Sequence, residues 1–242
     1  LRSVARRIKA CMQKDDFAMR MGGDEFLVWL EDTKEDGIEG RLSQLQDYLG
    51  RVFNVGAGKS VNLNYSFGIS VRPNHGDTPE KLLRKADIAV FNAKRNGRGR
   101  CEYYSESMES DMQKRLEIEQ EIRRGITNNE FVVWFQPKVR NKEGQHRLAG
   151  LEALVRWKHP DQGWVSPAVF LDISEETRQI IPLGREVFKQ ACEAARQWER
   201  DELLDAEARI AINISPIQLE DKNLLKSIDK IIKESRVNTS RL

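Results

Sequence analysis

The alternation of apolar and polar residues near the start of the chain predicts a short hairpin. Residues 17–21 and 26–30 are rich in strand-forming side chains, and Gly22-Gly23-Asp24-Glu25 separates them. Residues 61–71 place apolar side chains at every second position, which predicts one strand with a buried face. Helical spacing predicts three helices in this half: residues 1–12, residues 36–53, and a third from Thr78-Pro79 to Asn96-Gly97.

The second half of the chain has a different texture. A linking helix is predicted over residues 106–125, and the continuous apolar run FVVWF at 131–135 is typical of a strand buried on both faces. The remaining elements follow from the same periodicities: strands at 148–157 and 210–214, and helices at 183–200 and 224–235. Strand–helix–strand order favours a parallel sheet with ligands at the carboxyl ends of its strands. We therefore expect a domain at 1–104, a linking helix at 105–126 and a second domain at 127–242.

Composition narrows the class of protein. The 242 residues are 39% hydrophobic and 32% charged, as in soluble globular proteins, and a net charge of +2 gives no support to nucleic-acid binding. No apolar run approaches the roughly 20 residues that cross a bilayer, so we expect no membrane contact from this segment. Cys11, Cys101 and Cys192 lack zinc-ligand spacing, and reduced thiols in the cytoplasm are expected.

The predicted hairpin turn could carry chemistry. Glycines let a backbone approach a nucleotide closely, and carboxylates can hold the Mg²⁺ that neutralises a reacting triphosphate. From the residues alone, Asp24 and Glu25 fit a solvated turn equally well. Lys94 and Arg98, one helical turn apart, likewise fit a basic helix end favoured by the helix dipole.

The stretch RMGGDEF at 20–26 resembles the signature of the GGDEF family, the diguanylate cyclases. YSFGIS at 65–70 and LLRKADIAVFNAKRNGRGR at 82–100 extend the resemblance. It implies that Asp24 is a catalytic metal ligand with Glu25 beside it, that Gly22 and Gly23 face the nucleotide, and that Lys94 and Arg98 contact its phosphates. It also implies that two such domains meet as a homodimer, each bringing one GTP.

The stretch LEALVRWKHP at 151–160 resembles the signature of the EAL family, the cyclic-di-GMP phosphodiesterases. WFQP at 134–137, GWVSPAVF at 163–170 and INISPIQL at 212–219 occur where that family has them. The resemblance implies Mg²⁺ or Mn²⁺ as cofactor, bound by the catalytic Glu152 and by Asn213, with Gln136 and Arg156 contacting the dinucleotide. From the residues alone, Asn213 fits a hydrogen-bonded strand-end amide equally well, whereas an unpaired buried Glu152 would be costly. His159 is predicted to be a structural turn residue.

The two resemblances together imply a tandem α/β fold: the C-terminal part of a GGDEF α+β domain, then the N-terminal part of an EAL TIM-like (β/α) barrel. Further family ligands are expected before Leu1 and after Leu242, so the fragment alone should be inactive. The family's RxxD inhibition motif falls on residues 13–16, where Gln13 replaces the arginine. The expected function is hydrolysis of cyclic-di-GMP to pGpG, in the cytoplasm or at the inner membrane through an upstream anchor. The alternatives are synthesis of cyclic-di-GMP from GTP, and a receptor or scaffold without turnover.

Overall fold

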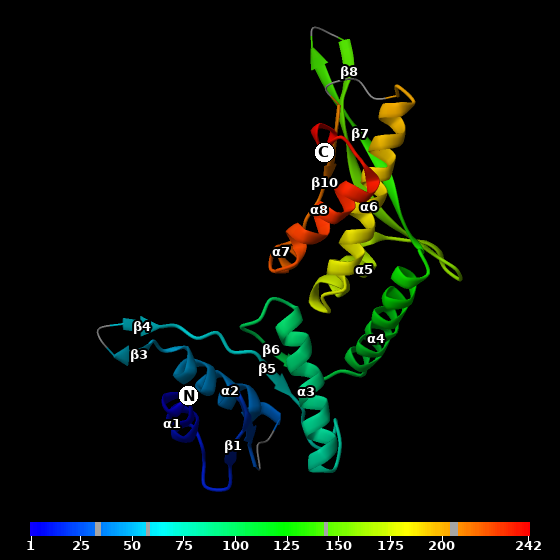
Figure 1. The fold of residues 1–242 in the computed structure, drawn as a ribbon. Helices are drawn as coiled ribbons and strands as arrows, with labels where there is room; N and C mark the ends of the chain where they lie inside the picture. The colour runs from blue at the N-terminus through cyan, green and yellow to red at the C-terminus, as the bar shows by residue number, and fades with distance from the viewer. Residues whose placement is uncertain (32–34, 57–58, 143–144, 204–207) are drawn as a thin grey trace. The chain divides into compact units, whose positions relative to one another are not determined.

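The chain forms two compact units, Leu1–Glu109 and Ser110–Leu242, in a computed structural model (Figure 1). The structure describes residues 1–31, 35–56, 59–142, 145–203 and 208–242. Each unit has its own hydrophobic core. None of the helices in these ranges combines the length and apolar character that spanning a bilayer requires.

The described residues of the first unit form three pairs of short strands together with helices. In chain order its elements are α1 (Arg2–Ala10), β1 (Phe17–Gly22), β2 (Glu25–Trp29), α2 (Glu35–Gly50), β3 (Phe53–Gly56), β4 (Lys59–Val61), β5 (Phe67–Ile69), α3 (Pro79–Arg95) and β6 (Cys101–Tyr103). Strands β1 and β2 form the predicted antiparallel hairpin, β3 pairs with β4, and β5 runs parallel to β6. Helices α1 and α2 bury Val4, Ile8, Leu45 and Leu49 against Phe53.

Helix α3 begins and ends where the sequence predicts. The Thr78 hydroxyl accepts a hydrogen bond from the Lys81 N–H, Pro79 occupies the first turn, and Asn96 follows the last helical residue. The helix packs closely on β5, where a side chain at Gly68 would lie 2.1 Å from the Ala86 carbonyl oxygen. Lys94 lies in the last turn of α3 and is exposed to solvent.

Two predictions for this unit are wrong. Residues 61–71 do not form one strand with a buried face, because β4 and β5 belong to different pairs and all three residues of β4 are exposed. Alternation shows which side chains could share a face, but a strand also needs a partner for its backbone groups. The helix predicted to end at Phe53 ends at Gly50, and Phe53 instead begins β3 and fills the core.

The second unit is a mixed sheet with helices packed on it. Its elements are α4 (Glu106–Thr127, beginning at the end of the first unit), β7 (Phe131–Lys142), β8 (Gln145–His159), β9 (Gly163–Val165), α5 (Pro167–Glu176), α6 (Ile180–Arg200), β10 (Arg209–Ile212), α7 (Pro216–Leu219), α8 (Leu224–Ser235) and a 3-10 turn (Thr239–Arg241). The strand order is β10-β8-β7, with β9 added to β8. The sheet therefore places the two predicted site strands, β8 and β10, side by side.

The prediction of a parallel sheet is correct for β8 and β10 and wrong for β7. Strand β10 runs parallel to β8, with Ala211 opposite Glu152, whereas β7 runs antiparallel to β8, with Gln136 opposite Glu152. Only two residues separate β7 from β8 in the sequence, and a parallel pair needs a longer crossover. The short connection thus dictates the antiparallel pair.

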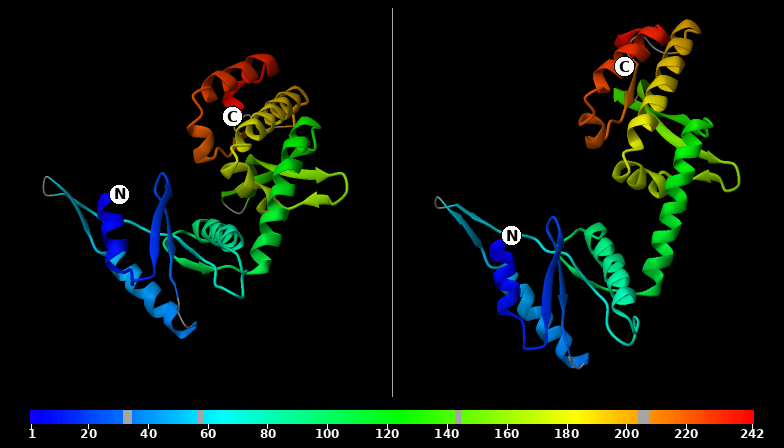
Figure 2. Two further views of the ribbon diagram at one scale, coloured as in Figure 1. Left: turned by 90° about the horizontal axis from the view of Figure 1, so that it is seen from below. Right: turned by 60° about the horizontal axis from the view of Figure 1, so that its bottom comes forward.

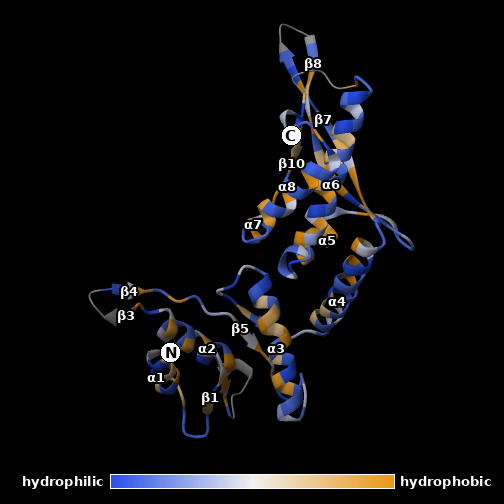
Figure 3. Ribbon diagram, in the orientation of Figure 1, coloured by the Kyte–Doolittle hydropathy of each residue, from blue (hydrophilic) through white to orange (hydrophobic). Residues whose placement is uncertain are grey.

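One face of this sheet is covered by helices and the other carries the predicted site residues. Helix α6 lies along the sheet (Figures 1 and 2) and buries Ala191, Cys192 and Ala195 with Ala153 and Ile210. Apolar and hydrophilic residues interleave along α6, as in an amphipathic helix (Figure 3).

The prediction that residues 131–135 are buried on both faces is wrong. Trp134 is 50% exposed, while Phe131, three residues earlier on β7, is buried. Side chains alternate between the faces of a strand, so Trp134 and Gln136 lie on the same face. This is also the face of Glu152, because Gln136 and Glu152 are opposite each other in the ladder.

Candidate functional site

A polar pair on the sheet face that carries Gln136 and Glu152 joins β8 to the end of β10. Asn213 Nδ2 donates to Glu152 Oε1 over 2.8 Å. Asn213 directly follows β10, at the carboxyl end where α/β folds place ligands. The parallel register brings the two side chains together although neither strand alone would do so.

A residue that the sequence analysis did not single out completes this cluster. Lys138 Nζ lies 3.0 Å from Glu152 Oε2, so the two carboxylate oxygens have different partners. The hydrogen bond from Asn213, and then the hydrogen bond and the charge of Lys138, lower the pKa of the Glu152 carboxyl. The signal was present in the sequence, because Lys138 follows Gln136 by two residues and thus shares its face.

Gln136 and Arg156 lie on the same face but make different contacts. Gln136 is exposed and is the ladder partner of Glu152. The Arg156 guanidinium lies 5.3 Å from the ring centre of Trp134 and also donates to the Val155 carbonyl at 2.8 Å. The structure therefore groups Gln136, Glu152 and Asn213 and sets Arg156 beside them with an aromatic neighbour.

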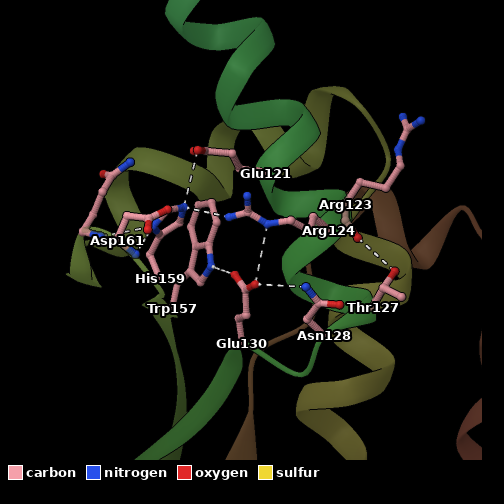
Figure 4. Close-up of polar contacts among 10 residues, drawn as sticks. Glu121, Arg123, Arg124, Thr127, Asn128, Glu130, Trp157, His159 and Asp161 are labelled. Atoms are coloured by element: carbon pink, nitrogen blue, oxygen red, sulfur yellow. Dashed lines mark hydrogen bonds and ion pairs between the residues drawn. The ribbon is translucent and has the colours of Figure 1, made fainter.

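His159 has the structural role that the sequence predicts. Its side chain is fully buried, and its Nδ1 accepts hydrogen bonds from the Asp161 and Gln162 N–H groups at 3.1 and 3.2 Å. Its Nε2 lies 3.4 Å from a Glu121 carboxylate oxygen and 3.0 Å from the Arg124 guanidinium (Figure 4). The ring thus closes the turn between β8 and β9 and attaches it to α4.

Arg124, which contacts His159, also belongs to a group of polar contacts around Glu130 at the start of β7. Glu130 accepts hydrogen bonds from the indole N–H of Trp157 at 3.1 Å and from the Asn128 amide at 3.3 Å (Figure 4). Arg124 Nε lies 3.6 Å from the same carboxylate. Trp157 directly follows Arg156, so this cluster holds the strand that presents the candidate site.

In the first unit, the β1–β2 turn presents its acids to solvent. Gly22 is opposite Glu25, and Gly23 adopts a positive φ of 46° that favours glycine. The Arg20 guanidinium donates from Nε to the Gly23 carbonyl at 3.0 Å, which ties the strand to the turn. Asp24 and Glu25 are both exposed.

Helix α3 brings one of the two predicted basic residues to this turn. Lys94 Nζ lies 3.0 Å from Glu25 Oε1, and both side chains are largely exposed. Arg98 lies beyond the helix end with φ of 59°, and its own N–H donates to the Ala93 carbonyl. Within the described residues, the ionic contact to the turn therefore comes from Lys94.

Asp87 is a further acidic residue near this turn that the sequence analysis did not single out. It lies two helical turns before Lys94 on α3. Partial burial, and then the charge of Glu25, raise the pKa of its carboxyl. The candidate site of the first unit thus includes Glu25, Lys94 and Asp87.

A profile of the EAL domain family matches residues 119–242, which is just over half of the chain. The chain belongs to the EAL family. Residues 1–100 match the profile "Diguanylate cyclase, GGDEF domain", so this is a GGDEF–EAL tandem, as the motifs predicted. The mixed α/β fold and the order of the two domains are confirmed as well.

Curated relatives match nearly the whole chain. Cyclic di-GMP phosphodiesterase PdeR of Escherichia coli is 33% identical over 97% of this chain and 34% of its own length. The bifunctional diguanylate cyclase/cyclic di-GMP phosphodiesterase MucR of Pseudomonas aeruginosa is 30% identical over 99% and 34%. An uncharacterized signaling protein of Caulobacter vibrioides is 34% identical over 99% and 29%. The chain spans about a third of the length of these relatives.

A solved structure described as PaMucR phosphodiesterase in a c-di-GMP complex also resembles the chain. It is 30% identical and covers 52% of this chain and 49% of its own, with a TM-score of 0.48.

Membership of the EAL phosphodiesterase family implies dependence on a divalent metal ion in general. The described residues contain no group of three or more His, Cys, Asp or Glu side chains arranged to hold a metal. The Glu152 carboxylate and the Asn213 amide nevertheless supply the oxygen donors that Mg²⁺ and Mn²⁺ prefer. In this structure one oxygen of that carboxylate, Oε2, is already paired with a cation, the Lys138 ammonium group, at 3.0 Å.

The matching half of the inhibition motif in the GGDEF unit is a structural residue. The Asp16 side chain is 1% exposed and accepts hydrogen bonds from the Gln13 N–H at 2.6 Å, from the Glu31 N–H at 3.0 Å and from Arg41. Burial alone would raise the pKa of Asp16, but these hydrogen bonds together lower it. The carboxylate thus joins the loop after α1 to Glu31, which follows β2, and to Arg41 on α2.

Proposed function

We propose that the EAL unit hydrolyses cyclic-di-GMP to linear pGpG with Mg²⁺ or Mn²⁺. The observation that carries this proposal is the meeting of Glu152 and Asn213 at 2.8 Å from neighbouring parallel strands. The printed names of PdeR and MucR support it, since both are described as cyclic di-GMP phosphodiesterases. The activity belongs to the whole protein, of which the relatives suggest that this chain is a part.

The chain's own residues have defined roles in this proposal. Glu152 and Asn213 bind the metal, and Glu152 is catalytic through this role as a metal ligand. Gln136 and Arg156 contact the dinucleotide, the first from the strand opposite Glu152 and the second by its charge. Bound divalent cations activate water and stabilise the leaving oxygen of a phosphodiester.

The test is an assay of the full-length protein with cyclic-di-GMP and either metal, in which pGpG is measured by chromatography. We expect Glu152→Gln to slow hydrolysis at least about 100-fold, because removing a metal ligand removes the electrostatic stabilisation. Glu234→Gln, an exposed change on α8, is the matched control and should keep the rate. If Glu152→Gln retained the wild-type rate, the assignment of the metal site would be wrong.

We infer a second activity, diguanylate cyclase, for the GGDEF unit. The contact that favours it is the Lys94–Glu25 ion pair beside the exposed Asp24. In this reading Asp24 and Glu25 hold the metal, Gly22 and Gly23 admit the nucleotide, and Lys94 and Arg98 contact its phosphates. Two chains would meet as a homodimer, each with one GTP, and GTP as substrate places the reaction in the cytoplasm.

We propose that the chain divides into a GGDEF domain at 1–104, a linking helix at 105–126 that comprises most of α4, and an EAL domain at 127–242.

Incubation of the full-length protein with GTP and Mg²⁺ tests the cyclase independently of the phosphodiesterase. Production of cyclic-di-GMP supports it. Binding of cyclic-di-GMP with turnover of neither substrate would contradict both activities and leave a receptor.

A further inference from the structure

The Glu152 carboxylate is shared between two hydrogen-bond donors, one neutral and one positively charged. Its Oε1 accepts a hydrogen bond from the Asn213 amide, and its Oε2 forms an ion pair with Lys138 at 3.0 Å. We propose that the ammonium group of Lys138 competes with the divalent cation for Glu152 and so weakens metal binding. This inference rests on the proposed metal site at Glu152 and Asn213.

The ladder register explains why Lys138 can reach this carboxylate. Lys138 on β7 is opposite Gly150 on β8, while Glu152 is opposite Gln136. Gly150 has no side chain to block the lysine stem, and it cannot gain one easily, because a Cβ there would lie 2.5 Å from the Arg209 carbonyl oxygen. Lys138 and Glu152 are therefore diagonal neighbours across the β7–β8 ladder, and no side chain at position 150 stands between them.

The exposure of the pair decides which effect of Lys138 dominates. The Lys138 side chain is 51% exposed, so its flexible stem contributes little to holding Glu152 in one orientation. Its charge acts in both directions, because it attracts the carboxylate and repels an incoming cation. A competing exposed pair shifts an equilibrium by about two- to fivefold, so we expect removal of the charge to tighten metal binding by that factor.

The experiment is a titration of the full chain with Mn²⁺, in which free Mn²⁺ is measured by electron paramagnetic resonance. Lys138→Met should bind Mn²⁺ about two- to fivefold more tightly than wild type. Lys138→Arg keeps the charge and should bind as wild type does. Lys158→Met is the control, because Lys158 lies on the same face of β8, about 20 Å from Glu152.

Salt and a ligand variant complete the design. The difference between Lys138→Met and wild type should shrink at high NaCl, because salt screens exposed charges. Equal or weaker binding by Lys138→Met, or binding by Lys138→Arg as tight as that of Lys138→Met, overturns the inference while leaving the metal site intact. Mn²⁺ binding that Glu152→Gln leaves unchanged overturns the metal site itself, and this inference with it.

Discussion

Asn213 Nδ2 donates to Glu152 Oε1 over 2.8 Å, although the two residues are 61 positions apart in the sequence. Each lies on or just after a strand of the same parallel pair. Because the register of that pair sets their distance, residues that never touch the site can alter it. This relationship is the structural basis of the proposed phosphodiesterase and of the competing role of Lys138.

Lys94→Met should separate the chemistry of the GGDEF unit from its stability. The ion pair with Glu25 is exposed on both sides, so its loss should change the free energy of unfolding by less than about 1 kcal/mol. A lost charge-assisted contact to phosphate should slow cyclic-di-GMP synthesis by about tenfold or more. Arg95→Met, the neighbouring exposed change, is the control, and an unchanged synthesis rate for Lys94→Met would contradict the assignment.

Gly68→Ala should destabilise the GGDEF unit strongly. A Cβ at this position would lie 2.1 Å from the Ala86 carbonyl oxygen and 2.2 Å from the Val90 nitrogen, both backbone atoms that cannot move alone. We expect a loss of about 3 kcal/mol in urea unfolding. Gly40→Ala is the matched control, because Gly40 lies within α2 with open space around it, and it should gain about 0.5 to 1 kcal/mol. Equal stabilities for the two variants would contradict the packing of α3 on β5.

Asp16 should make the stability of the GGDEF unit depend on pH in the acid range. Its folded-state pKa is lowered, so its contribution is complete above the ordinary aspartate range and is lost as pH falls through the lower folded value. Asp16→Asn should cost about 3 kcal/mol at pH 7, because it leaves Arg41 buried without its partner.

The measurement is urea unfolding from pH 7 to pH 3. The Asp16→Asn profile should fall less steeply below about pH 4 than that of wild type, because the titrating group is absent. Asp15→Asn changes the exposed neighbour and should follow wild type throughout. Parallel profiles for wild type and Asp16→Asn would show that Asp16 does not carry this dependence.

Glu130→Ala should weaken the attachment of β8 to α4 in the EAL unit. It would leave the indole N–H of the buried Trp157 without its acceptor, which costs about 1 to 3 kcal/mol. Glu117→Ala, on the exposed side of α4, should change stability by less than about 0.5 kcal/mol. Thermal unfolding followed by circular dichroism compares them, and similar melting temperatures would exclude the proposed role of Glu130.

Local signals predicted some elements well and others poorly. Helix α3 could be placed from Thr78 and Pro79 because a cap acts within one turn of the chain. The strand expected over 61–71 failed because a ladder needs a partner, and β4 and β5 have different ones. The strand at 131–135 was expected to be buried on both faces, but Trp134 is half exposed. The composition of a run does not reveal what covers each face of a sheet.

The sequence by itself determined the family, the order of the two domains and the residues to examine, because short motifs place glycine, acid and amide groups at fixed spacing. Only the tertiary structure decided which of these groups meet. It joined Glu152 to Asn213 and Lys94 to Glu25, and it added Lys138 to the first pair. It also made Asp16 a buried support. The physical reason is that strand register and helix packing, which act between segments distant in the chain, set the distances on which charge and coordination depend.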